Sequence, residues 1–64
     1  MKYIIKIQEH LDMMWAEWFD GMQISHENDG TTTLIGTVED QAALQGILKK
    51  ISHLNLELIS VNKV

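Results

Sequence analysis

The chain has 64 residues, a formal net charge of −4 and no cysteine, which excludes disulfides, thiolate metal ligands and cysteine nucleophiles. A domain of this length buries only about 60% of the surface that its unfolded chain exposes, so its stability is marginal and a partner would add to it. The sequence also lacks arginine, which leaves no candidate for bidentate recognition of phosphate or guanine, and we expect no nucleic-acid binding.

Two segments with different periods open the chain. Residues 2–8, KYIIKIQ, alternate apolar and polar side chains, which predicts a strand with one buried face, although Ile4 interrupts the polar face. Residues 11–19, LDMMWAEWF, carry apolar side chains at helical spacing. We therefore predict a short amphipathic helix that ends at Gly21 and uses Trp18 to anchor the core.

A hairpin is predicted over residues 21–38. The Asn28-Asp29-Gly30 sequence supplies the turn, with Gly30 able to adopt the left-handed conformation. A three-residue loop places Ile24 opposite Leu34, whereas a two-residue Asp-Gly turn shifts the pairing by one position. The three-residue loop gathers four apolar side chains on the core-facing side: Met22, Ile24, Leu34 and Val38.

Residues 38–51, VEDQAALQGILKKI, predict a second helix that is capped by Asp40. Its core face consists of Leu44, Ile47, Leu48 and Ile51. Gly46 lies on the other side of this helix, where glycine costs about 1 kcal/mol relative to alanine. Together with Ala42 and Ala43 it forms a small-residue flank that leaves room for close packing of another helix, from the same chain or from another protomer.

Residues 54–64 predict a final strand, which is either bulged or buried on both faces because Ile59 and Val61 follow the alternating Leu56 and Leu58. The element order predicts one α+β domain over residues 1–64. We expect the ferredoxin-like split βαβ arrangement (βαββαβ), a four-stranded antiparallel sheet with two helices on one face. The rival arrangement is a sheet completed by strand exchange between two chains.

The sheet face opposite the helices is predicted to carry an apolar patch. Its expected members are Ile4, Ile35, Ile59 and Val61. Contiguous apolar patches on the surface of a protein usually mark an interface, so we predict a homodimer through this face. The alternative is a stable monomer, in which the patch is modest and is covered by threonine methyl groups and lysine stems.

Catalytic, cofactor and metal sites have weak support. His10 and Asp12 are two residues apart, while His26 and His53 lie on other predicted elements, and none of these spacings is typical of metal ligands. A cluster of Glu9, His10 and Asp12 could perform acid–base chemistry inside a cleft. The simpler interpretation is that the two carboxylates stabilise the N-terminus of the following helix. We expect no catalytic residue, no cofactor and no metal.

Trp15 and Trp18 have two interpretations. So short a chain needs bulky side chains to build a core, and their spacing places both on the apolar stripe of the first helix. Alternatively, their indole rings line an apolar ligand cleft between this helix and the sheet.

Four motifs make the sequence similar to a family of small bacterial proteins of unknown function. They are Trp15-x-x-Trp18-Phe19-x-Gly21, Asp29-Gly30-Thr31, Asp40-Gln-Ala-Ala-Leu-Gln-Gly46 and Leu56-x-Leu58-x-Ser60-Val61. The resemblance covers nearly the whole chain, and the Asp-Gln-Ala-Ala-Leu element is its most specific part. Many members carry histidine where this chain has Gln45, so no role of that histidine transfers here. The resemblance implies no activity.

The leading hypothesis is a non-enzymatic, self-associating interaction or regulatory module that forms a homodimer or binds another protein. The alternative is a small-molecule-binding domain with its site at a helix–sheet cleft or a dimer seam, and a small enzyme comes third. The first ten residues have too short an apolar run for a signal peptide or a membrane span. We expect a cytoplasmic protein without membrane contact, in agreement with the absence of cysteine.

Overall fold

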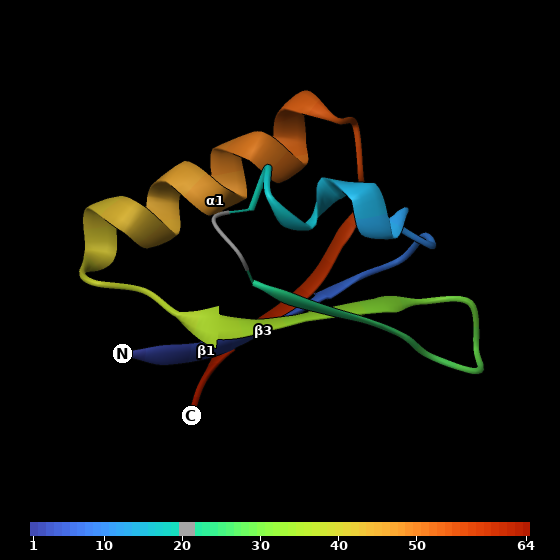
Figure 1. The fold of residues 1–64 in the computed structure, drawn as a ribbon, viewed down its shortest axis with the longest axis horizontal. Coiled ribbons are helices and arrows are strands. Elements are labelled where there is room, and N and C mark those ends of the chain that lie inside the picture. The colour runs from blue at the N-terminus through green and yellow to red at the C-terminus, as the bar shows by residue number, and fades with distance from the viewer. Residues whose placement is uncertain (20–21) are drawn as a thin grey trace.

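The computed structural model describes residues 1–19 and 22–64. Four strands form one sheet, namely β1 (Lys2–Ile7), β2 (Gln23–His26), β3 (Thr32–Thr37) and β4 (Leu58–Lys63). One short 3-10 helix, η1 (Met13–Ala16), and one α-helix, α1 (Gln41–His53), lie on the same side of this sheet (Figure 1). The described residues therefore form an α+β fold.

The sheet is antiparallel throughout and has the strand order β2-β3-β1-β4. The first strand lies in the middle, where Ile5 is opposite Leu34 of β3 and Val61 of β4. Because side chains alternate along a strand, these residues share one face, and Ile4 and Ile35, which are also opposite each other, share the other. The predicted four-stranded antiparallel sheet is confirmed.

The core lies between the sheet and α1. Alternate residues of β1 point into it, as the alternation of residues 2–8 predicts, and the helix contributes three residues at helical spacing. Its central members are Tyr3, Ile5, Ile7, Leu44, Ile47 and Ile51. The four apolar residues predicted on the core side of the hairpin, Met22, Ile24, Leu34 and Val38, are all buried there.

The hairpin turn has the predicted three-residue loop. The backbone N–H of Glu27 donates to the carbonyl of Thr31 at 2.9 Å, and Gly30 has a φ of 88°, which glycine adopts without strain. The carboxylate of Asp29 accepts the hydroxyl of Thr31 at 2.6 Å and its backbone N–H at 3.1 Å. These two hydrogen bonds lower the pKa of Asp29, and they hold the turn closed.

Both ends of α1 are satisfied by local hydrogen bonds. At the start, the Asp40 carboxylate accepts the backbone N–H of Ala43 at 2.8 Å, so the predicted N-cap is confirmed. At the end, Asn55 has a φ of 61° and donates its N–H to the carbonyl of Ser52. The N–H of Leu56 then reaches back to the carbonyl of Ile51 at 3.2 Å, which completes a Schellman motif.

The predicted first helix is wrong. Of residues 11–19 only Met13–Ala16 are helical, and Gly21, the expected terminator, lies outside the described residues. A nine-residue helix is marginal on its own. Here Leu11 is tied to the sheet, because its N–H donates to the hydroxyl of Thr32 at 2.8 Å.

Trp18 is consequently not the core anchor that the helical spacing predicts. Its side chain is 45% exposed, and that of Met14 is 75% exposed, whereas Phe19 is fully buried. The single turn at η1 rotates the apolar residues to different sides instead of aligning them in one stripe. Phe19 is therefore the aromatic residue of this segment that belongs to the core.

Two further expectations are wrong, namely the sheet face of Val61 and the close packing of another helix of this chain at Gly46. Val61 lies opposite Ile5 and packs against the core, so it belongs to the helix-facing side of the sheet. The cause is a register shift in β4 that leaves Ile59 without a partner on β1, so the bulged alternative for this strand is confirmed. A Cβ atom at Gly46 would meet nothing within 4 Å, so no other helix of the described chain packs closely there.

Thr32 connects the sheet to the segment that follows β1. Its side chain is fully buried, accepts the N–H of Leu11 and donates to the carbonyl of Glu9 at 2.6 Å. One hydroxyl thereby satisfies two backbone groups of the turn after β1, of which the N–H of Leu11 is buried. This clamp fixes where the chain leaves the sheet toward η1.

Replacement of Phe19 by alanine is expected to destabilise the protein by about 3–5 kcal/mol, because a fully buried aromatic side chain leaves a cavity. Replacement of Trp18 is expected to cost about 1–2 kcal/mol, from its aromatic and cation–π contacts. Urea denaturation followed by circular dichroism measures both. An equal loss in the two variants would contradict the assignment of Phe19 as the anchor.

Thr32→Val is expected to cost about 1–3 kcal/mol, since a shape-matched side chain leaves the buried N–H of Leu11 unpaired and removes the part-buried hydrogen bond to the Glu9 carbonyl. Thr33→Val is the matched control on the next residue, whose hydroxyl makes only a 3.3 Å contact with Glu27 on the other face. The difference in the urea midpoint of the two variants measures the clamp. A Thr32→Val protein as stable as the control would refute it.

Candidate functional site

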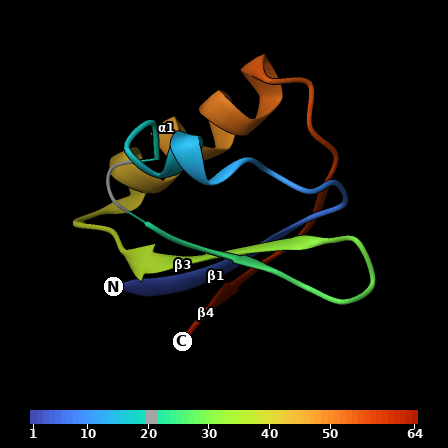
Figure 2. The ribbon, with the colours of Figure 1, turned by 45° about the vertical axis from the view of Figure 1, so that its right-hand side comes forward.

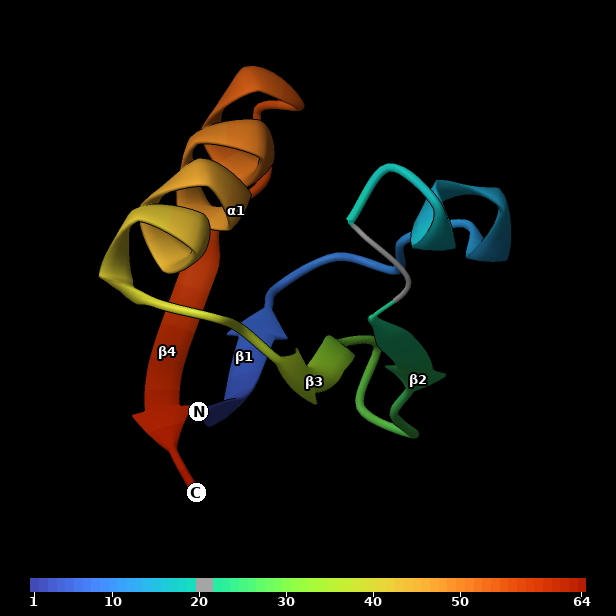
Figure 3. The same ribbon diagram turned by 60° about the vertical axis from the view of Figure 1, so that its left-hand side comes forward.

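A hollow of about 270 Å³ lies between Trp18 and α1. Five described residues line it: Trp18, Gly46, Lys49, Lys50 and His53. Figure 3 shows that α1 lies over the β4 side of the sheet and η1 over the β2 side. The hollow is open to solvent, and four of its five residues come from one side of α1.

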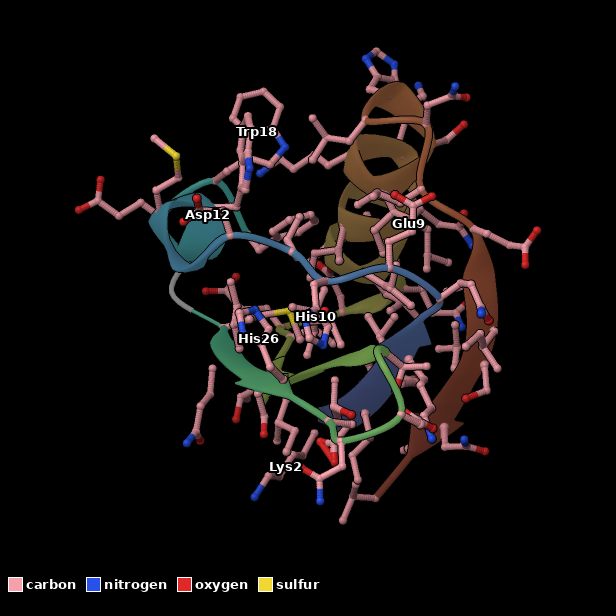
Figure 4. All side chains as sticks on the ribbon, turned by 90° about the vertical axis from the view of Figure 1, so that its right-hand side faces the viewer. Lys2, Glu9, His10, Asp12, Trp18 and His26 are labelled. Carbon is pink, nitrogen blue, oxygen red and sulfur yellow. The ribbon has the colours of Figure 1, made fainter. Side chains whose placement is uncertain are left out.

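Contacts to the backbone carbonyl of Trp18 and to its indole ring hold this residue at the hollow. The ammonium group of Lys50 donates to the Trp18 carbonyl at 2.7 Å and lies 5.5 Å from the centre of the indole ring. Trp15 packs against the same ring edge-to-face, with a centroid distance of 6.1 Å and an interplanar angle of 76°. These contacts position an exposed aromatic ring beside a helix. Figure 4 shows Trp18 standing away from the sheet.

The small-residue flank of α1 has an open surface. Ala42 is exposed, Ala43 packs partly against the core, and Gly46 contributes to the hollow beside Trp18. The space that the sequence predicts around Gly46 therefore exists, but the described chain does not fill it with a second helix. Packing by another protomer stays a prediction.

His10, on the turn after β1, and His26, the last residue of β2, form a second candidate site. Their rings are stacked, 4.7 Å apart and 15° from parallel, and Figure 4 shows them side by side. The Nε2 atom of His10 contacts the carbonyl of Glu27 at 3.4 Å, and Nε2 of His26 donates to the carbonyl of Leu11. Backbone carbonyls therefore orient both rings.

This histidine pair is short of ligands and of acid–base partners. The Asp12 carboxylate beside it accepts the N–H of Met14 at 3.0 Å and so caps η1, as the simpler interpretation of this residue expects. Within residues 1–19 and 22–64, no three side chains of the His, Asp and Glu types are grouped to hold a metal ion. The third histidine, His53, lies on α1 at the hollow beside Trp18 and not next to this pair. We assign the pair a structural part in fixing the turn against β2.

The third candidate is the sheet face turned away from α1, called the outer face below. It carries Ile4 and Ile35 at its centre, on neighbouring strands, and both are partly buried by their neighbours. Around them, alternation places Lys2, Lys6, Gln23, Ser25, Thr33, Thr37, Ser60 and Asn62. Ile59 lies at the register shift of the edge strand and is 44% exposed. The structure thus brings two of the four predicted patch residues together.

Sequence reasoning missed the cationic lining of the hollow. Gly46, Lys49, Lys50 and His53 are spaced at i, i+3, i+4 and i+7, which places them along one stripe of α1. This spacing was readable in the sequence. The sequence also offered Trp18 as a cleft residue, but it placed that cleft between the first helix and the sheet, whereas the hollow lies between Trp18 and α1. Thr32 was missed for a similar reason, since its two partners are 21 and 23 residues away.

None of the helices in residues 1–19 and 22–64 is long and apolar enough to cross a membrane.

Comparison with known proteins places the chain in a family. A family model described as a domain of unknown function, DUF8691, matches residues 2–62. Searches of curated proteins and of solved structures gave no match. Because the matched range covers almost all of the 64 residues, the protein belongs to the DUF8691 family.

Proposed function

We propose that this protein is a non-enzymatic association module whose chains pair through the outer face of the sheet. The observation that carries the proposal is the pair formed by Ile4 and Ile35, which lie opposite each other on the two central strands. The helix covers only the other face of the sheet (Figure 2). In a sheet with one covered face, the solvated face is normally polar, so an apolar centre favours a covering partner.

The polar residues around this centre suit a second copy of the same chain. Lys2 and Lys6 project from β1 on the outer face, and Glu27 lies beyond the end of β2 on the same face. The Glu27 carboxylate accepts the hydroxyls of Ser25 and Thr33, which orients it along that face. In a two-fold interface each contact occurs twice, so a lysine of one chain and Glu27 of the other make two complementary pairs.

The size of the outer face predicts a weak dimer. Three strands of six residues and one of four cover about 20 by 20 Å, roughly 400 Å² in projection. A standard interface buries about 800 Å² on each partner, which would be about a fifth of the 4223 Å² surface of this chain. The outer face is therefore at the small end of the range, and association is expected at micromolar concentration or above. Burial of Ile4 and Ile35 would add stability that so short a chain needs.

The proposal includes a more specific assignment of the fold. The order β2-β3-β1-β4 with antiparallel neighbours supports a split βαβ arrangement in which the segment with η1 takes the place of the first helix. Replacing a full helix by a single turn leaves less apolar surface inside the chain. This shortage is a further reason for a partner.

Sedimentation equilibrium of the wild-type chain, from about 10 to 500 µM, is expected to show a monomer–dimer equilibrium. Ile35→Lys is expected to weaken it by at least about tenfold, roughly 1.4 kcal/mol, because an ammonium group would be buried at the centre of the interface.

Gln45→Lys is the control, since it adds the same charge on the exposed side of α1 and should leave the equilibrium unchanged. A wild-type chain that stays at 7.3 kDa over the whole range would refute the proposal. So would an Ile35→Lys variant that dimerises as strongly as the control.

A further inference from the structure

The sheet ends at β4, whose outer edge carries backbone groups that point away from the other strands. In the strand order β2-β3-β1-β4, β4 is paired only with β1 among the described residues. The N–H of Val64 donates to the carbonyl of Lys2, so the backbone groups of Val64 point toward β1. Because these groups alternate in direction along a strand, those of Asn62 also point toward β1. The N–H and C=O groups of Val61 and Lys63 therefore point to the free edge.

The features that normally prevent strand addition at a sheet edge are weak in β4. Natural edge strands are often very short, or carry prolines and charged side chains. β4 has six residues, LISVNK, with no proline and with Lys63 as its single charged residue, whereas β2 at the other edge has four residues. The register shift at Ile59 affects only the start of β4, and residues 60–63 keep regular pairing with β1.

The described residues on either side of positions 20 and 21 lie at the other edge of the sheet. The N–H of Met22, which precedes β2, donates to the carbonyl of Phe19 at 3.2 Å. β2 and β4 are at opposite ends of the strand order. The free edge of β4 is therefore defined by described residues.

Apolar side chains lie beside this edge on the side of α1. Leu58 is opposite a buried core residue of β1, so it faces α1, and it is 43% exposed. Val61 faces the same side and is partly buried. Lys50 of α1 reaches the carbonyl of Trp18, in the segment over the β2 side of the sheet (Figure 3). Leu48 lies two residues earlier, about 200° around the helix, and so points toward the free edge of β4.

The position of α1 indicates what kind of chain fits this edge. Figure 3 shows α1 over the β4 side of the sheet. If β4 paired with β4 of a second copy, the two-fold axis would place both helices on the same face, above strands that are about 5 Å apart. Packed helices need about 8–10 Å between their axes, so the two copies of α1 would compete for the same space. An extended segment that carries no helix of its own avoids this conflict.

We propose that β4 accepts an extended segment of another protein as a fifth, antiparallel strand. Its backbone pairs with the outward-pointing N–H and C=O groups of Val61 and Lys63, the mode known as β-augmentation. Residues opposite each other in an antiparallel pair share a face. The partner therefore carries an apolar residue opposite Val61 and an acidic residue opposite Lys63, two positions earlier in its own sequence. Lys63 is exposed, and opposite charges across a strand pair stabilise the pairing.

This association is separate from the proposed dimer. The groups of β4 that bind the partner point along the plane of the sheet, whereas the dimer uses the outer face around Ile4 and Ile35. Ile35 lies on β3, and β1 separates that strand from β4.

The test uses the peptide acetyl-Ser-Glu-Thr-Val-Thr-Ser-amide as the partner. Two-dimensional ¹H–¹⁵N NMR of the whole chain follows the backbone N–H signals of Val61 and Lys63 during titration. The peptide is expected to shift them saturably, with a Kd below about 1 mM. Near saturation it is expected to slow hydrogen exchange of these two amides with water at least about fivefold. The N–H of Asn62, which points toward β1, is the internal reference and should change less than about twofold.

Two N-methylated forms of the peptide test the backbone pairing. N-methyl groups on its glutamate and valine remove the donors that face β4, and binding is expected to weaken at least about tenfold. N-methyl groups on its two threonines alter amides that face away from β4. This matched control should bind within about threefold of the unmodified peptide.

Charge reversal tests the assigned register. Lys63→Glu is expected to weaken binding of the peptide at least about threefold, and to bind a peptide with lysine in place of glutamate more tightly than the wild type does. Lys49→Glu is the control, since it changes the net charge equally on the side of α1 that faces the hollow, and should bind within about twofold of the wild type. Ile35→Lys, which weakens the proposed dimer, should still bind the peptide, so the two proposals can fail independently.

Three results would overturn the proposal. They are shifts of Val61 and Lys63 that do not saturate, equal binding of the two N-methylated peptides, and a loss of binding in Lys49→Glu equal to that in Lys63→Glu. In the peptide-free chain, exchange at Val61 and Lys63 that slows as the protein concentration rises would show a second copy at this edge, which also contradicts the proposal.

Discussion

The pairing of β1 on both of its edges is the constraint on which the rest of this structure depends. The strand is joined to β3 and β4 along its length, and the pairing continues beyond its ends. Met1 exchanges backbone hydrogen bonds with Val38, and the N–H of Val64 donates to the backbone carbonyl of Lys2 at 2.8 Å. The first and last residues of the chain are thereby hydrogen-bonded beside the start of β1, and the register of β1 with β3 and β4 decides which face each of its side chains takes.

Alternation along β1 then divides the molecule into two surfaces with different properties. Tyr3, Ile5 and Ile7 face α1 and form the core. Lys2, Ile4 and Lys6 face outward, so one strand supplies both the main stabilising surface and the proposed interface. A shift of β1 by one residue would exchange these two sets and destroy both surfaces at once.

The layer above the sheet is held by fewer and more specific contacts. The Thr32 hydroxyl fixes the start of the segment with η1, and the Lys50 ammonium group fixes its other side through the Trp18 carbonyl. Between these two contacts the chain makes only one short helical turn. The hollow beside Gly46 lies between this segment and α1.

The sequence by itself determined the features that depend on neighbouring residues. The turn at Gly30, the cap at Asp40 and the alternation of residues 2–8 are all confirmed, because each arises from interactions within a few positions of the chain. The core residues of α1 followed from the same short-range periodicity.

Three features depended on the tertiary structure alone. They are the conformation of the segment between β1 and β2, the sheet face on which Val61 lies, and the set of residues that line the hollow. Periodicity predicted a helix over residues 11–19, but hydrogen bonds from Thr32, more than twenty positions away, hold the start of this segment instead. The register shift in β4 reversed the face expected for Val61, and no local pattern specifies where such a shift occurs. In both places the energies of distant contacts exceed the weak propensities of a short segment, and the sequence alone does not reveal which distant groups will meet.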